Sequence, residues 1–405
     1  MRLGQRSRWA LLAIAVSVAA AIGLSGCQAS APVVVRVYAS FPMRGPKIGG
    51  SLVKGIQLAF DQIESRLGST EIKLIILDDG DENGQWQADV ERANVDLAVS
   101  DSTALAYLGP MNSGAAQVSL PVSNRAGLAQ ISPSTTWPGL TKAGFAQGQP
   151  AIFYPTGRRT FFRTCGTDDV QGPAAAQWAA ELGFRTFYVL DDGEAYGAGI
   201  AALFSQHASQ LGLTELGRQT IDKKSVDFRT VLEAVQRADP DVVYFGGTVA
   251  NGAALLVQQL RALGVRAAFM GPDAILDTTL IDIAGQSAEG VYATFVGVPP
   301  DQIETDLGRK FAAAYREKYN EPPEAYAQLG FDAAQALIAA MRQTATLDRA
   351  GVLAALAAPR EYQGTTGAFS FDARGDTTRQ LVSGNVVRGG AFQFAKQLVV
   401  PQQGY

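Results

Sequence analysis

Four short polar segments, each directly after an apolar run, contain the side chains best suited to hold a small solute. They are residues 108–114, 131–136, 245–248 and 270–273. In open α/β sheets, the carboxyl ends of the strands converge on a ligand crevice. Ser113 is predicted to cap a helix whose first amide groups point at that crevice, where a carboxylate would gain hydrogen bonds and the positive end of the helix dipole. The alternative is that Ser113 is a cap and nothing more.

The sequence matches known catalytic and nucleotide-binding motifs only in part or not at all. Residues 197–202 match the dinucleotide pattern G-x-G-x-x-A, but Gly197 lies seven residues beyond Leu190, whereas that fingerprint needs its glycine turn directly after a strand. The sequence has no G-x-x-x-x-G-K-[ST] motif, and Met111 stands where a nucleophile elbow at Ser113 would need glycine. We therefore predict a protein that is not an enzyme and has no cofactor.

Metal binding and acid–base catalysis also find little support. His207 is the only histidine, so histidine catalysis and multi-histidine metal sites are nearly excluded. Residues 79–84 imitate the first half of an EF-hand loop, but Val90 occupies the position of the last ligand, and we interpret the segment as a solvated acidic loop. Cys165 is predicted to be a small buried apolar residue and not a reactive thiol.

The elements that must position these segments alternate between apolar runs and helical periods, which is typical of a mostly parallel sheet covered on both faces. The predicted strands are residues 33–38, 72–77, 104–108, 186–190, 242–245, 267–270 and 291–295. Between them, Ile56, Ala59 and Ile63 share one helical face, as do Leu256, Leu260 and Leu263. Residues 301–341 are predicted to form a long helical block.

The N-terminal residues have the pattern of an export signal. Three arginines precede an apolar run, and the run ends in Leu-Ser-Gly-Cys at residues 24–27. This ending resembles a bacterial lipobox, so we expect cleavage after residue 26 and a lipid anchor on Cys27. The alternative is an ordinary secretory signal or a short membrane anchor, although the apolar run is shorter than the ~20 residues that span a bilayer.

The mature chain would have 379 residues, with 31 basic and 38 acidic side chains. This length is too large for one simple core and fits two lobes of ordinary domain size. The acidic balance makes nucleic acid an unsuitable partner.

The segments described above resemble the leucine/isoleucine/valine-binding family of periplasmic solute receptors, from about residue 35 to about residue 394. The strongest stretches are residues 108–114 with 131–141, 162–176, 189–199 and 241–290. The resemblance implies an α/β fold of two Rossmann-like lobes joined by three hinge crossings, the type I periplasmic-binding-protein fold. We place lobe 1 at residues 34–167 and 297–378, and lobe 2 at residues 168–296 and 379–400.

The resemblance also implies a set of ligand-binding residues: Ser113 for an α-carboxylate, the segment Ser134, Thr135 and Thr136 on the same lobe, and Tyr196, Thr248 and Asp273 on the other lobe. Asp273 would face an α-ammonium group, since no other partner for it is evident, and the alternative is that Asp273 caps a helix. Thr248 stands where leucine-binding members have tyrosine, which would enlarge the pocket or change its polarity. Residues 41–48 include Arg44 and Lys47, so a ligand with a second acidic group fits as well.

The resemblance implies an extracytoplasmic, lipid-anchored substrate-binding protein of an ABC importer. Its ligand would be a branched-chain amino acid or a related small zwitterion, and its partners the permease and ATPase subunits. We expect a monomer that contacts the membrane through its lipid anchor. The alternatives are an exported nucleotide-linked α/β enzyme and a sensor subunit for small amides or amino acids.

The lipobox interpretation predicts that metabolic labelling with a fatty acid marks the wild-type protein and does not mark Cys27→Ser. Equal labelling of the two proteins would contradict the anchor. More than one acyl chain is expected for stable retention, because a single chain binds membranes only weakly.

Overall fold

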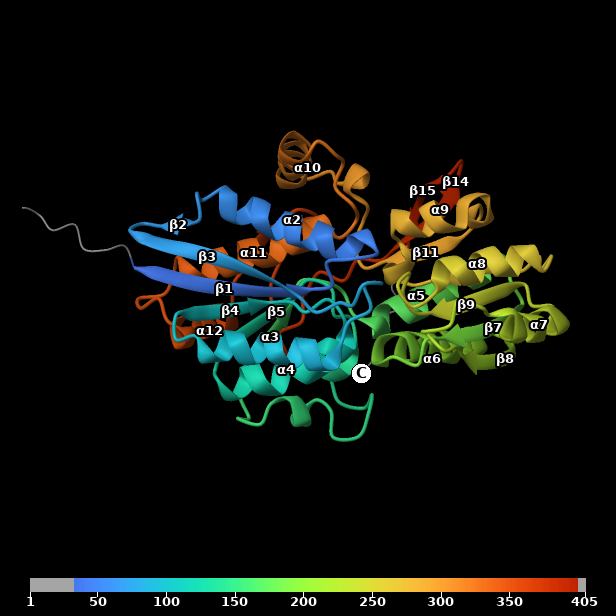
Figure 1. The fold of residues 1–405 in the computed structure, drawn as a ribbon, viewed down its shortest axis with the longest axis horizontal. Coiled ribbons are helices and arrows are strands. Elements are labelled where there is room, and N and C mark those ends of the chain that lie inside the picture. The colour runs from blue at the N-terminus through green and yellow to red at the C-terminus, as the bar shows by residue number, and fades with distance from the viewer. Residues whose placement is uncertain (1–32, 400–405) are drawn as a thin grey trace, which may run out of the picture. The chain divides into compact units, whose positions relative to one another are not determined.

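The computed structural model of the protein describes residues 33–399 (Figure 1). The predicted export signal and Cys27 lie outside the described residues. Among the helices of residues 33–399, none combines the length and the apolar character needed to cross a bilayer.

A six-stranded sheet with its helices forms the part of the chain that we call lobe 1. Its strand order is β2-β3-β1-β4-β5-β6, and all neighbours are parallel except β2 and β3. The strands are β1 (Val34–Phe41), β2 (Arg66–Leu67), β3 (Thr70–Asp78), β4 (Ala104–Leu108), β5 (Ala129–Ser132) and β6 (Phe161–Arg163). The helices are α2 (Lys47–Asp61), α3 (Ala88–Ser100), α4 (Ser113–Arg125), α10 (Asp306–Tyr319), α11 (Ala327–Met341) and α12 (Arg349–Ala357).

A seven-stranded sheet with its helices forms lobe 2. Its strand order is β15-β14-β11-β10-β9-β7-β8, with β14 and β15 antiparallel at one edge. The strands are β7 (Thr186–Asp191), β8 (Thr214–Thr220), β9 (Val242–Gly246), β10 (Ala268–Gly271), β11 (Tyr292–Phe295), β14 (Ser383–Arg388) and β15 (Ala391–Gln397). The helices are α5 (Asp168–Glu181), α6 (Ala195–Gln210), α7 (Arg229–Ala238), α8 (Ala253–Ala262) and α9 (Thr278–Ala284).

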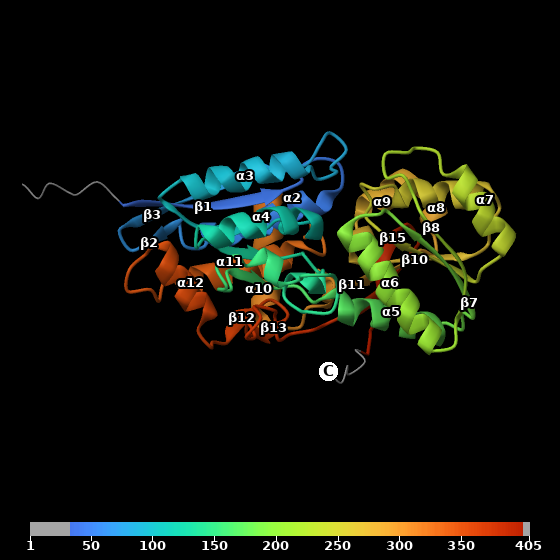
Figure 2. The same cartoon turned by 90° about the horizontal axis from the view of Figure 1, so that it is seen from below.

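Alternate side chains of each central strand enter different cores, as expected for a sheet covered on both faces. Val35, Val37 and Ala39 of β1 belong to the cluster that contains the buried faces of α2 and α11. Tyr38 belongs instead to a cluster with Val95 of α3. Figures 1 and 2 show α2 and α11 on one side of β1 and α3 and α4 on the other.

The chain passes between the two sheets three times, which confirms the predicted fold class. It leaves β6 for α5 and β7, returns from β11 to α10, and passes from the hairpin of β12 (Tyr362–Gly364) and β13 (Gly367–Phe369) to β14. The residue bounds predicted for the two lobes stay a prediction. The order of strands explains why the polar segments after β4, β5, β9 and β10 meet at the carboxyl ends of two sheets.

A fully buried arginine fixes the first crossing to the loop before it. Arg163, the last residue of β6, donates from Nε to Asp376 at 2.7 Å, and Asp376 precedes the third crossing. Its Nη1 donates to the carbonyl oxygens of Thr135 and Trp137, both at 2.9 Å. Removing one partner of such a buried pair costs about 3–5 kcal/mol. The loop that follows β5 is therefore held by the hinge itself.

The long helical block predicted at residues 301–341 consists of two helices, α10 and α11. α10 ends at Tyr319, and Asn320 follows with a positive φ of 55°. Pro322 and Pro323 then separate it from α11, since proline has no amide hydrogen to donate and its ring clashes with a helical turn.

The interpretation of residues 79–84 as a solvated loop is wrong for its first residue. Asp79 is fully buried, and burial, with the nearby charge of Asp78, raises its pKa to about 7. Cys165 is fully buried and free, as predicted, and burial raises the pKa of its thiol.

Candidate functional site

A small cavity between the two lobes collects most of the predicted ligand-binding residues. It has an empty volume of about 260 Å³ and is lined by Met111, Asn112, Ser113, Ser134 and Tyr326 of lobe 1 and by Tyr196, Thr248, Asp273 and Ala274 of lobe 2. Five of the seven predicted residues are in this set. The other two, Thr135 and Thr136, are fully buried but do not line the cavity.

Ser113 stands at the amino end of α4 but does not cap it. The helix begins at Ser113, with Asn112 at the N-cap position and no capping bond from the Asn112 side chain. The Ser113 hydroxyl instead accepts a hydrogen bond from the Trp137 backbone amide at 3.2 Å. The first-turn amides of α4 and the positive end of its dipole therefore remain free of a side-chain cap at the cavity wall.

The loop after β5 is built to present Ser134. The Ser132 hydroxyl donates to the Pro110 carbonyl at 2.8 Å and accepts from the amides of Ser134 and Thr135 at 3.2 and 2.9 Å. Ser134 in turn donates to the Met111 carbonyl at 3.2 Å. These bonds tie the loops after β4 and β5 together, so both serine hydroxyls of the cavity have fixed positions.

Asp273 is the charged centre of the cavity, and it has partners that the sequence did not reveal. The Tyr196 hydroxyl donates to its Oδ1 at 2.6 Å, and the Tyr326 hydroxyl donates to its Oδ2. Asp273 is 1% exposed and begins a short 3-10 turn whose N-cap position is held by Pro272. The expectation that it lacked another partner, and the alternative that it is a helix cap, are both wrong.

Met111, Asn112, Ala274 and Tyr326 line the cavity but are not in the predicted ligand set, and of these Tyr326 contacts Asp273 directly. It directly precedes α11 of lobe 1 and lies 53 residues along the chain from Asp273 of lobe 2. Its bond joins the two lobes, whereas Tyr196 is on the same lobe as Asp273. A tyrosine between Ala325 and Ala327 gives no local signal of this role, because the role depends on how the lobes meet.

A second buried carboxylate lies behind the first. Asp168, at the start of α5, is fully buried, and neither of its oxygens has a hydrogen-bond partner of normal geometry among residues 33–399. Burial, with the negative charge of Asp273, raises its pKa well above the ordinary value. Burial also raises the pKa of Asp273, against the effect of the two tyrosine bonds. The region thus favours a cation, because a positive group would stabilise the ionised form of both buried carboxylates.

A neighbouring cavity extends the first toward the loop after β1. The two share Met111, Asn112, Thr248 and Ala274, and the second is otherwise lined mainly by apolar and glycine residues: Pro42, Arg44, Pro46, Ile48, Gly49, Gly84, Val249 and Ala250. Arg44 is the one charged residue of this lining. Lys47, the other cation of the loop, binds Thr278 and Asp282 instead and lines neither cavity.

The glycines that imitate a dinucleotide motif have packing roles inside α6. A Cβ atom on Gly197 would lie 2.5 Å from the Gly246 carbonyl oxygen, so the glycine lets α6 approach the end of β9. A Cβ atom on Gly199 would lie 2.2 Å from the Trp137 ring of lobe 1. The motif therefore serves contacts of a helix with a strand and with the opposite lobe, and it is not at a strand–helix turn.

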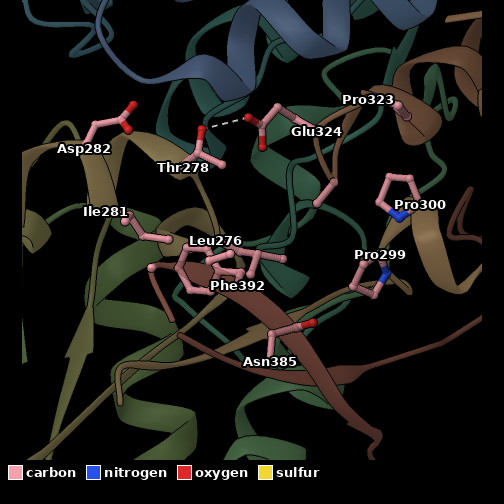
Figure 3. Close-up of a pocket in the computed structure, with 13 residues that line it drawn as sticks. Leu276, Thr278, Ile281, Asp282, Pro299, Pro300, Pro323, Glu324, Asn385 and Phe392 are labelled. Carbon is pink, nitrogen blue, oxygen red and sulfur yellow. Dashed lines mark hydrogen bonds between the residues drawn. The ribbon is translucent and has the colours of Figure 1, made fainter. Parts of the chain in front are cut away.

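A larger cavity, with an empty volume of about 860 Å³, lies elsewhere between the lobes (Figure 3). It is lined by residues of α9, of β14 and β15, and of the segments before α10 and α11. None of its lining residues belongs to the predicted ligand set. Size alone therefore does not identify the ligand site in the described part of the chain.

Comparisons with known proteins bear on the family and the fold of this chain. Residues 35–391 match the family model described as periplasmic binding protein. A Leu/Ile/Val-binding protein homolog of Brucella abortus is 29% identical, over 89% of this chain and 91% of the relative. A leucine-binding protein of Thermotoga maritima has a TM-score of 0.80 at 25% identity and covers 90% of this chain and 98% of its own. A branched-chain amino acid binding protein of Streptococcus pneumoniae, solved with isoleucine, has a TM-score of 0.79 at 24% identity, with 91% and 100% covered.

The raised pKa of Asp273 predicts that affinity for a ligand with an ammonium group falls as the pH falls. The free carboxyl protonates at a higher pH than the ordinary value of about 3.9, whereas a bound ammonium group keeps it ionised. Binding should therefore release protons as the pH falls toward the ordinary carboxyl range, as calorimetry from about pH 8 to about pH 4 in buffers of different ionisation enthalpy would measure. Affinity that is constant over this range, with no proton release, would contradict a titrating carboxylate at the site.

Proposed function

The chain belongs to the periplasmic binding protein family, and on that premise we propose that it captures a zwitterionic amino acid between its lobes and delivers it to an ABC importer. The observation that carries the proposal is the buried Asp273 carboxylate, held at the wall of an interlobe cavity. The amino end of α4 and the Ser113 hydroxyl form the opposing wall.

The two walls have opposite electrostatic character. Helix amides and the positive dipole end of α4 suit a carboxylate, and the Ser113 hydroxyl, which accepts from the Trp137 amide, keeps its own hydrogen to donate. Asp273, with Asp168 behind it, suits an ammonium group. The carboxamide oxygen of Asn112 is buried without a hydrogen-bond partner among the described residues, so it is available to a ligand N–H group. An α-amino acid supplies both charged groups from one carbon atom.

The neighbouring cavity suits the ligand side chain. Its apolar lining by Pro42, Ile48 and Val249 favours an aliphatic group, since apolar burial contributes roughly 25 cal/mol per Å². Thr248 lies at the junction of the two cavities, where its Oγ1 accepts from the Asn251 amide at 3.1 Å. Branched-chain amino acids, which the relatives' names specify, are therefore the first candidates. Because Arg44 also lines this cavity, a ligand side chain with a polar end is compatible with it.

Recognition, and not a reaction, is the proposed activity. The ligand would stabilise the closed arrangement by contacting both lobes, and the three crossings would serve as the hinge. The proposed partners are the permease and ATPase subunits of the importer. We further propose an extracytoplasmic location with a lipid anchor at Cys27, and a monomeric protein.

A thermal-shift screen tests the ligand class. The panel contains the branched-chain amino acids, matched amines that lack the carboxylate, matched acids that lack the amino group, and aromatic carboxylates. At a concentration of 100 times its dissociation constant, a ligand stabilises the fold by about 2.7 kcal/mol. We expect stabilisation by amino acids alone. Stabilisation by a carboxylate that lacks the amino group, with none by amino acids, would contradict the proposal.

Two variants test the site with the ligand that the screen identifies. Asp273→Ala should weaken binding roughly a hundredfold or more, because it leaves the ligand's ammonium group without its counter-charge.

Tyr326→Phe should weaken binding of the same ligand roughly tenfold through loss of one hydrogen bond to a carboxylate. Tyr362→Phe is the matched control, since the Tyr362 hydroxyl is buried in lobe 1 and has no partner among residues 33–399. If Tyr326→Phe and Tyr362→Phe behave alike in titration calorimetry, Tyr326 has no part in binding.

A further inference from the structure

The amino end of α2 is not capped by its own lobe. The N-cap position is Pro46, which makes no side-chain capping bond, and the first turn has no acidic residue but begins with Lys47. The first amides of a helix have no partner within the helix, and a cation at this end opposes the helix dipole. By the rules that govern isolated helices, this terminus is poorly stabilised.

The missing cap comes from lobe 2. Asp277 accepts a hydrogen bond from the Ile48 amide of α2 at 2.9 Å through Oδ2. Through Oδ1 it accepts from the Thr279 amide at 2.7 Å, and so it is also the N-cap of α9 in its own lobe. Asp277 is 1% exposed. One buried carboxylate thus caps two helices that belong to different lobes.

Weaker contacts surround this carboxylate. Lys47 donates from Nζ to Thr278 at 2.8 Å and to Asp282 at 3.0 Å, but both charged side chains are half exposed, so the pair contributes little. The Thr278 hydroxyl donates to Glu324 of lobe 1 at 2.8 Å, a bond that Figure 3 shows at one edge of the larger cavity. The buried Asp277 is therefore the principal member of the group.

The same turn carries the ligand-site carboxylate and the interlobe cap. Asp273 lies four residues before Asp277, and two bonds of the turn, Leu276 N–H to the Asp273 carbonyl and Asp277 N–H to the Ile275 carbonyl, are both 2.9 Å long. This compact segment joins lobe 1 at one end through Tyr326 and at the other end through Ile48. Opening of the lobes would break both connections.

We propose that Asp277 is an affinity-determining residue outside the ligand cavity, which caps α2 of lobe 1 when the lobes close and leaves it uncapped when they open. This role rests on the proposed clamp function, but not on which solute the clamp holds. Because the cap forms only in the closed state, it shifts the equilibrium toward that state and tightens the binding of any ligand that requires closure.

Asp277→Asn separates the two caps. Asparagine is as good an N-cap as aspartate, so its amide oxygen can keep the bond to Thr279 in α9. Its NH2 group then faces the Ile48 amide, and two donors cannot bond. The matched control is Asp348→Asn, because Asp348 caps only α12 of its own lobe by accepting from the Gly351 amide at 2.7 Å.

We expect Asp277→Asn to weaken the binding of the screened amino acid roughly 3- to 30-fold in titration calorimetry, the range of a lost helix cap. Asp348→Asn should bind as the wild type does. Unchanged affinity in Asp277→Asn would overturn the proposal, as would an equal loss in both variants. If Asp277→Asn does not fold, Asp277→Ser replaces it, since serine caps α9 and lacks the second oxygen.

A second measurement keeps the proposal separate from the proposed ligand class. If no amino acid binds the wild-type protein but another solute of the panel does, the proposed ligand class fails, and hydrogen exchange of the Ile48 amide in the proteins saturated with that solute then tests the cap. Faster exchange at Ile48 in Asp277→Asn than in the wild type and Asp348→Asn would support it. Equal exchange in the three proteins would overturn it.

Discussion

Burial of the Asp273 carboxylate between two lobes is the constraint on which the rest of the site depends. A carboxylate removed from water needs donors or a cation, or it must take up a proton. Tyr196 supplies one donor from the same lobe, and Tyr326 supplies the other from across the cleft. The second bond exists only where α11 meets lobe 2, so the need to satisfy one side chain links the hinge, the lobe contact and the ligand cavity.

The sequence predicted those parts of the structure that depend on local pattern. The apolar runs of β4, β7 and β9 were placed within one residue, since buried parallel strands are nearly continuous in Val, Leu, Phe and Tyr. β8 was missed because it is an edge strand with alternate exposed residues and the polar sequence Thr-Glu-Leu-Gly-Arg-Gln-Thr. Within the predicted helical block at residues 301–341, Pro322 and Pro323 separate two helices, since proline does not continue a helix.

The residues of the site also divide into those that the sequence predicts and those that it does not. Ser113, Ser134, Tyr196, Thr248 and Asp273, which the family resemblance implied, all line the cavity. Tyr326, and the roles of Asp168 and Asp277, depend on which segments of different lobes meet, and no local pattern encodes that. One local signal does point to the role of Asp277: proline and lysine stand at the start of α2, where a capping residue is expected. Where the local sequence does not satisfy a helix terminus, another part of the chain can complete it.

Solution scattering of the protein without residues 1–26, with and without a saturating amino acid, tests the central claim most directly. The account predicts that the radius of gyration falls when the ligand binds, because Asp273, Tyr326 and the α4 terminus can enclose it only when the lobes are together. Asp273→Ala, at the same ligand concentration, should show no such change. A radius of gyration that stays constant, while calorimetry shows the wild-type site to be saturated, would contradict closure around the ligand.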